Sequence, residues 1–82
     1  VDVVLERPEG LVPMEIKYQN CIVPSDSRNL LLFMEEFDVR TGFLITKDRF
    51  DKKTVNGREI LYLPAWLALL VQDTRVPGLV QE

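Results

Sequence analysis

The residues with the clearest chemical potential are Asp2, Glu15 and Lys17, which lie on two short apolar runs near the start of the chain. The runs cover residues 1–5 and 11–18, and the segment between them has the composition of a turn. If both runs are strands, the alternation of side chains places Glu15 and Lys17 on one face of the second strand. Two carboxylates and one ammonium gathered in this way could hold a divalent cation and act on a phosphodiester.

The pairing of the two runs decides whether the acidic residues can meet. A hairpin that turns at Pro8-Glu9 would place Asp2 directly opposite Glu15. Directly opposed side chains have Cβ atoms about 4.5–5.5 Å apart, which suits two carboxylates that share one cation. In that arrangement Asp2, Glu15 and the carbonyl of Ile16 would be the metal ligands. Lys17 would stabilise the charge that develops on the phosphate in the transition state.

The same three residues also have a simpler interpretation. Acidic residues and a lysine on the polar face of a hairpin often form a cross-strand ion pair, and short patterns of common residues occur by chance. Two observations favour a functional reason. Asp is uncommon in strands, yet Asp2 interrupts an apolar run. The neighbouring segments are apolar enough to indicate a sheet covered on both faces, where charged side chains are costly. Spacing alone leaves both interpretations open.

Composition limits the chemistry that the chain can perform. Its 82 residues are enough for one small domain. Histidine is absent, which excludes Ser-His-Asp and Cys-His catalysis and argues against a zinc site. Oxygen ligands remain, and they suit Mg²⁺ or Mn²⁺. The single cysteine, Cys21, cannot form an internal disulfide, and we expect it to be a partly buried hydrophobic residue in a reducing cytoplasm.

The net charge of −3 argues against a fragment that grips DNA by itself. Five basic residues nevertheless gather in one segment and could form a basic patch, although a solvated loop is the simpler interpretation. They are Lys47, Arg49, Lys52, Lys53 and Arg58. No run approaches the roughly 20 apolar residues of a membrane-spanning helix, and no signal peptide is visible. We therefore expect a cytoplasmic protein that does not span a membrane.

The rest of the sequence predicts a helix and three further strands. Leu30, Phe33, Met34 and Phe37 follow the spacing of one helical face, which predicts a helix over 28–38. Asp26 or Ser27 could cap its start. The short apolar run 42–47 is typical of a central strand covered on both faces, parallel to the strand that ends at Tyr18.

Near the end of the chain, Asn56-Gly57 predicts a type I′ hairpin between strands over 53–55 and 58–63, after a charged connection over 48–53. Pro64 should open a final helix over 65–72, in which Trp66 belongs to the core or to an interface. We therefore predict one α/β domain over residues 1–72, with a mixed sheet of four to five strands and two helices, followed by a tail over 73–82.

The succession of segments resembles a known family. Asp2 followed by Glu15-Ile16-Lys17 on the next strand, a helix and a buried strand is similar to the PD-(D/E)XK nuclease superfamily, whose core is αβββαβ. The segments VDVVLERPEGLVPMEIKY, SRNLLLFMEEF, GFLITK and ILYLPAWLALL resemble the C-terminal domain of archaeal and bacterial AAA-type ATPases, a family of uncharacterised function. The resemblance implies a restriction-endonuclease-like fold that lacks the first helix and strand of the core. Because Val1 reads as the interior of a strand, we expect a fragment of a longer protein whose missing element covered this edge.

The resemblance also implies a function. Asp2, Glu15 and Lys17 match the two acidic positions and the lysine of the superfamily, with Mg or Mn as cofactor, DNA as substrate and the ATPase module of the parent chain as partner. The missing first helix often supplies another acidic residue, so we expect the fragment alone to be inactive, and the chemistry of the parent is either real or vestigial.

Two alternatives belong to other classes. The acidic net charge and the apolar last helix fit a non-catalytic interaction module that docks on the ATPase or on a sister subunit. The open sheet edge also fits association between copies of the chain.

Overall fold

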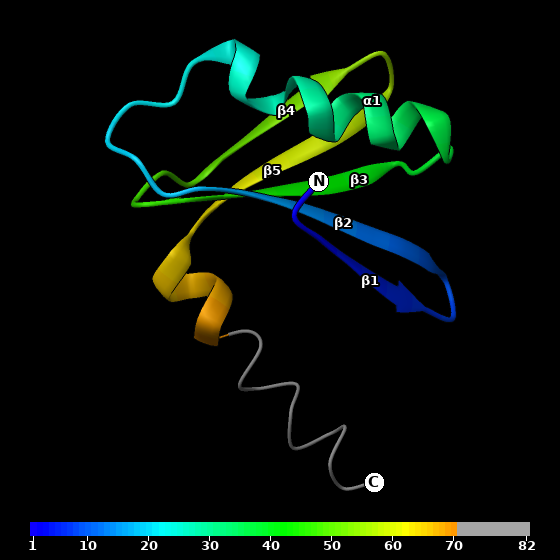
Figure 1. Ribbon diagram of the computed structural model, residues 1–82, viewed down its shortest axis with the longest axis horizontal. Coiled ribbons are helices and arrows are strands. Elements are labelled where there is room, and N and C mark those ends of the chain that lie inside the picture. The colour runs from blue at the N-terminus through cyan, green and yellow to red at the C-terminus, as the bar shows by residue number, and fades with distance from the viewer. Residues whose placement is uncertain (71–82) are drawn as a thin grey trace, which may run out of the picture.

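The computed structural model describes residues 1–70 and shows one mixed sheet with a helix lying across one face (Figure 1). The strands are β1 (Val3–Arg7), β2 (Gly10–Lys17), β3 (Thr41–Thr46), β4 (Asp51–Val55) and β5 (Arg58–Pro64), and their order in the sheet is β1-β2-β3-β5-β4. A 3₁₀ turn, η1 (Pro24–Ser27), leads into α1 (Arg28–Glu36), and residues 65–70 are helical again. The predicted α/β class with a mixed sheet is confirmed. The predicted tail over 73–82, and the end of the last helix, lie outside the described residues.

The first hairpin has the register that the sequence predicts. Val3 pairs with Met14 and Arg7 pairs with Gly10. Continued by one residue beyond Val3, this register brings residue 2 opposite residue 15. The two-residue turn is Pro8-Glu9, and Gly10 follows with a φ of 138°, which a glycine adopts without strain. A two-residue loop leaves the strands little freedom to slip, so the register follows from the turn.

The three inner strands run parallel. β2 pairs with β3 and β3 pairs with β5, which places Leu44 level with Glu15 on one side and with Tyr62 on the other. The prediction that the strand after α1 is central and parallel to β2 is confirmed. A parallel neighbour requires a crossover, and η1 and α1 provide it.

Helix α1 starts at Arg28 as predicted and ends two residues before the predicted end. Asp38 adopts a left-handed φ of 54°, and the N–H of Val39 donates to the carbonyl of Met34 at 2.8 Å. This is the Schellman arrangement that terminates helices. The predicted caps act elsewhere, because Asp26 accepts from the N–H of Val23 at 2.9 Å ahead of η1, and α1 has no side-chain cap.

The second hairpin confirms the type I′ prediction. Asn56 and Gly57 have φ values of 51° and 79°, as this turn requires at both central positions. β4 begins at Asp51, so residues 51–53 of the expected charged connection over 48–53 belong to a strand. The prediction of a solvated basic loop is therefore wrong for this part. Lys52 and Lys53 belong to a strand and point to opposite faces of the sheet.

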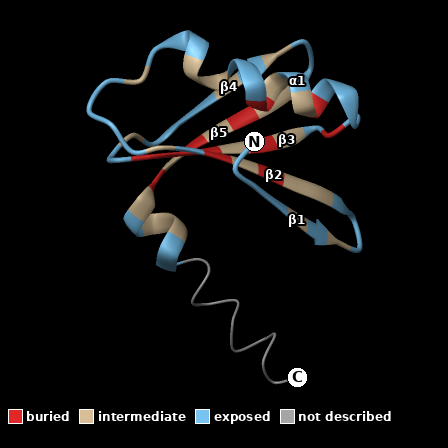
Figure 2. Ribbon diagram, in the orientation of Figure 1, coloured by how far each residue is buried: buried red, intermediate tan, exposed pale blue. Residues whose placement is uncertain are grey.

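The core lies between α1 and the sheet. Leu30 and Met34 of α1 pack with Leu44, Ile60 and Tyr62, and all five side chains are at most 1% exposed. Figure 2 shows this buried layer along β3 and β5, beneath the helix. This layer supplies the apolar burial that stabilises the described fold.

Gly42 on β3 sets how closely the helix approaches the sheet. A Cβ atom at this position would lie 2.6 Å from the sulfur of Met34 and 3.0 Å from Cδ1 of Leu30. These short distances show that Gly42 faces α1. Because side chains alternate along a strand, Leu44 and Thr46 face α1 as well.

The opposite face of the sheet is only partly covered within residues 1–70. Ile16 is 50% exposed and Trp66 60% exposed, and the helical turn that contains Trp66 lies across the sheet from α1 at one end (Figure 1). The prediction of two covered faces is confirmed for the central strand β3, where Ile45 on this face is 9% exposed, and is wrong for β2, where Ile16 remains exposed. Trp66 is not a core residue. Cys21 is also exposed, contrary to expectation, because it lies in the loop between β2 and η1.

Candidate functional site

The face of β2 that carries Glu15 and Lys17 is the face covered by α1. Glu15 is level with Leu44 in the parallel ladder, and Leu44 shares its face with Gly42, which touches the helix. Glu15 is accordingly buried, with 7% of its surface exposed. The apolar residue between the two, Ile16, points to the open face. The polar side of this strand is thus the covered side, the reverse of an ordinary amphipathic strand.

The carboxylate of Glu15 is incompletely satisfied. Its Oε1 accepts no hydrogen bond from the described residues, and it is the only buried side-chain polar atom among them without one. The N-terminal ammonium of Val1 lies 3.3 Å from Oε1, a distance suited to charge attraction although the geometry is not that of a hydrogen bond. A buried oxygen with unused acceptor capacity is costly, and the ammonium, or another cation in its place, offsets that cost.

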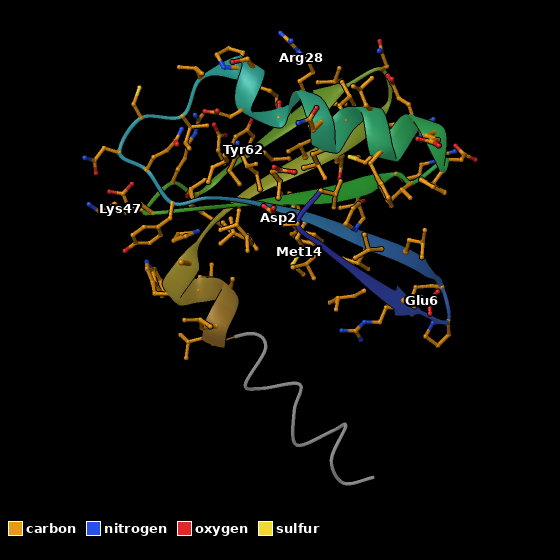
Figure 3. The ribbon with its side chains drawn as sticks, viewed as in Figure 1. Asp2, Glu6, Met14, Arg28, Lys47 and Tyr62 are labelled. Carbon is orange, nitrogen blue, oxygen red and sulfur yellow. The ribbon has the colours of Figure 1, made fainter. Side chains whose placement is uncertain are left out.

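Asp2 lies one strand away from Glu15 and is anchored by the main chain. Its Oδ2 accepts from the N–H of Ile16 at 2.7 Å, and its own N–H donates to the carbonyl of Met14 at 3.0 Å. Figure 3 shows Asp2 where the start of the chain meets β2. The hairpin therefore brings Asp2 beside the Glu15-Ile16 segment, as its register predicts. The Oδ2 atom is directed at the backbone of β2, which holds the carboxylate in place.

Lys17 occupies the last position of β2, level with Thr46 of β3. It is half-buried, and its ammonium forms no ion pair with any residue in 1–70. The simpler interpretation, an ion pair among the three residues themselves, is therefore not observed in the described part of the chain. Lys17 lies at the carboxyl end of a parallel strand, the edge at which ligands bind in open α/β sheets.

Thr46 and Arg49 shape the same edge and were not expected from the sequence. The buried hydroxyl of Thr46 accepts from the N–H of Arg49 at 2.9 Å and donates to its carbonyl at 3.1 Å. These bonds fix the connection between β3 and β4. A buried threonine at a strand end carries no distinctive sequence signal, because its partner comes from a non-periodic loop.

Arg49 also lies over the ring of Tyr62, with 4.6 Å between the guanidinium carbon and the ring centroid. It donates to Asp51 at 2.9 Å, and this hydrogen bond raises the pKa of Arg49. The same bond, followed by one from the N–H of Lys52, lowers the pKa of Asp51. Glu15, Leu44 and Tyr62 lie level with one another on three neighbouring strands. This row across the sheet therefore connects the carboxylate of Glu15 with Arg49, which lies over Tyr62.

The residues present fit a cation held by few protein ligands. Among residues 1–70, no group of three or more His, Cys, Asp or Glu side chains gathers as a metal cage. Asp2, Glu15 and the carbonyl of Ile16 remain as neighbouring oxygen donors. Mg²⁺ commonly binds through one or two carboxylates and completes its shell with water and substrate phosphate, so this donor set suits Mg²⁺ or Mn²⁺.

No protein-family model, curated protein or solved structure matches this chain. No helix in the part of the chain that the structure describes has the length and apolar character to cross a membrane. Fold and site together define a small α/β domain with a mixed five-stranded sheet and a buried carboxylate under its helix. A fold of this class hosts many activities, so function has to be argued from the site.

Proposed function

We propose that this chain is a nuclease-fold domain of the PD-(D/E)XK type, from the C-terminal region of an AAA-type ATPase, with Asp2, Glu15 and Lys17 as its phosphodiester site. The observation that carries the proposal is the buried Oε1 of Glu15, which accepts no hydrogen bond from residues 1–70, pairs only with the Val1 ammonium there and lies one strand from Asp2. The element order lends support, because a hairpin, a helix and a parallel strand follow one another as in the last part of an αβββαβ core.

Each of the three residues has a distinct role in this proposal. Glu15 is held by a central strand, and the hydrogen bond from Ile16 orients Asp2, so both carboxylates are positioned before a ligand arrives. Mg²⁺ or Mn²⁺ bound there would polarise a phosphoryl oxygen and lower the pKa of a bound water. Lys17, free of carboxylate partners within residues 1–70, would offset the negative charge that develops at the phosphate.

Calorimetric titration of the 82-residue chain with Mg²⁺ and Mn²⁺ tests the metal site. We expect one saturable site that Glu15→Gln and Asp2→Asn each weaken at least about tenfold, since a bound carboxylate charge is lost. Glu59→Gln on β5 is the control, because this carboxylate pairs with Lys52 on the other face of the sheet. Circular dichroism verifies that each variant is folded. The absence of saturable binding, or equal binding by Glu15→Gln, would contradict the proposal.

Acetylation of the amino group of Val1 provides a second arm. The ammonium now lies 3.3 Å from Oε1 of Glu15, so it competes with a metal for the same oxygen. Removal of its charge should strengthen metal binding by the wild-type chain and leave Glu15→Gln unaffected. Weaker binding after acetylation would show that the metal does not use this oxygen.

A second candidate function is a non-catalytic docking module, and the exposed apolar face favours it. Ile16, 50% exposed, lies on the face of the sheet that α1 leaves open, and the helical turn that contains the 60% exposed Trp66 lies on the same side (Figure 1). This function predicts that Lys17→Ala leaves the activity of the parent protein intact, whereas Ile16→Asp abolishes it. The nuclease proposal predicts the opposite order, because Lys17→Ala would then lower Mn²⁺-dependent plasmid cleavage by the parent at least about tenfold.

A further inference from the structure

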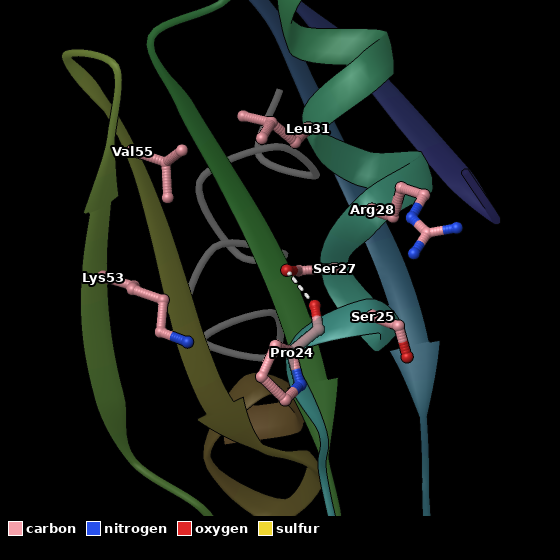
Figure 4. Close-up of a pocket in the computed structure, with 7 residues that line it drawn as sticks. All are labelled: Pro24, Ser25, Ser27, Arg28, Leu31, Lys53 and Val55. Carbon is pink, nitrogen blue, oxygen red and sulfur yellow. Dashed lines mark hydrogen bonds between the residues drawn. The ribbon is translucent and has the colours of Figure 1, made fainter.

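A groove of about 570 Å³ lies between the start of α1 and the edge strand β4 (Figure 4). This volume falls within the range of sites that hold small ligands or parts of larger ones. The groove is lined by Pro24, Ser25, Ser27, Arg28, Leu31, Lys53 and Val55. β3 and β5 separate β4 from β2, so the groove is a distinct place from the candidate metal site.

The charge of this groove is positive, although the chain as a whole is acidic. Its lining contains two cations and two hydroxyl groups and no carboxylate. Arg49, Lys52 and Arg58 nearby each pair with a carboxylate. Lys53 and Arg28 form no ion pair with any residue in 1–70. Asp51, the carboxylate that shares the covered face of β4 with Lys53, pairs with Arg49 at 2.9 Å and also attracts Lys53 electrostatically without forming an ion pair with it. A concavity lined by cations and by no carboxylate attracts anionic ligands.

The side chains that line the groove differ in where they point. In Figure 4, Lys53 extends from β4 across the groove toward Pro24, whereas the Arg28 side chain projects from the opposite side of α1, away from β4. The Nζ of Lys53 lies 5.9 Å from the ring centroid of Tyr62, whose face favours a cation there. Leu31 provides an apolar wall.

We propose that this groove binds a backbone phosphate of a nucleic-acid strand, with Lys53 as the direct contact. The inference rests on the proposed function for the identity of the ligand as a nucleic acid. A lysine binds phosphate as a point charge, and such contacts add affinity without reading sequence. The apolar wall fits the sugar that lies next to each phosphate.

Neighbouring residues on β4 provide a matched control. Lys52 and Lys53 have the same charge and adjacent positions, but alternation puts only Lys53 in the groove, while Lys52 pairs with Glu59 on the other face. Binding of a short fluorescein-labelled DNA strand is measured by anisotropy over a series of KCl concentrations. We expect Lys53→Gln to weaken binding about 3–10-fold and to lower the slope of log K against log salt by about 1. Lys52→Gln should change affinity by less than about twofold, and Arg28→Gln should weaken binding less than Lys53→Gln does.

Several outcomes would overturn the inference. They are an absence of DNA binding by the wild-type chain, equal effects of Lys52→Gln and Lys53→Gln, and NMR shifts at Val55 and Ser25 with inorganic phosphate but not with DNA. The metal titration of Glu15→Gln fails or succeeds independently of these results. If DNA binding depends on Lys53 but no metal site is found, the groove proposal stands and the nuclease proposal fails. If a metal site is found but DNA binding does not depend on Lys53, the nuclease proposal stands and the groove proposal fails.

Discussion

The two faces of the sheet differ in what covers them and in the residues they carry. On the covered face, Leu44 and Tyr62 are buried beneath α1, and Glu15 is buried at the margin of the same layer. On the open face, Ile16 remains half exposed, although it neighbours Glu15 in the chain. The charged candidate site thus lies in the covered layer, while much apolar surface faces outward.

The difference teaches that the helix follows the best packing partner and not the most apolar side of each strand. Gly42 lets Met34 and Leu30 approach β3 closely, and Ile60 and Tyr62 extend the same surface on β5. β2 is bound to β3 in a fixed register, so its face toward the helix is decided by its neighbours. Glu15 is buried as a consequence.

Truncation of one residue on each face gives the largest expected contrast. Leu44→Ala should lower the free energy of unfolding by about 2–5 kcal/mol, because it leaves a cavity beneath α1. Ile16→Ala should cost less than about 1 kcal/mol, since half of that side chain already contacts water. Urea denaturation measures both. Equal losses would show that the open face is covered in solution and that the comparison fails.

Enlargement of Gly42 tests the close approach of the helix. Gly42→Ala should destabilise the chain by about 1–3 kcal/mol, because the new methyl group would meet Met34 and Leu30. The control is a double-mutant cycle with Met34→Ala, which removes the nearest atom. The combined loss should be smaller than the sum of the single losses. Strict additivity would indicate that the helix does not rest on β3 at this point.

The smallest expected effect is the loss of stability on acidification that comes from the exposed pair of Arg49 and Asp51, at the end of the covered face. The hydrogen bond from Arg49 lowers the pKa of Asp51 in the folded chain. Its contribution is fully present above the ordinary Asp pKa of about 3.9 and is lost as the pH falls through the lowered value. The pair is exposed, so the loss should be slight. Thermal melting from neutral to about pH 2 should show that Arg49→Gln removes this component of the acid sensitivity, and an identical pH profile would refute the assignment.

Part of the candidate site was predictable from the sequence because it depends on local rules. The Pro8-Glu9 turn fixes the register that brings Asp2 beside Glu15, and alternation places Glu15 and Lys17 on one face. The role of Arg49 was not predictable, because its contacts with Thr46 and Tyr62 join a loop to two strands.

The sequence by itself determined the turns at Pro8-Glu9 and Asn56-Gly57, the start of α1 and the parallel placement of β3, since each depends on backbone preferences or on chain connectivity. Only the tertiary structure decided which face of the sheet the helix covers, and hence that Glu15 is buried and Ile16 open. Alternation along a strand defines two faces but not which of them is covered. That choice is made by the combined fit of β3 and β5 to one helix, which no single segment encodes.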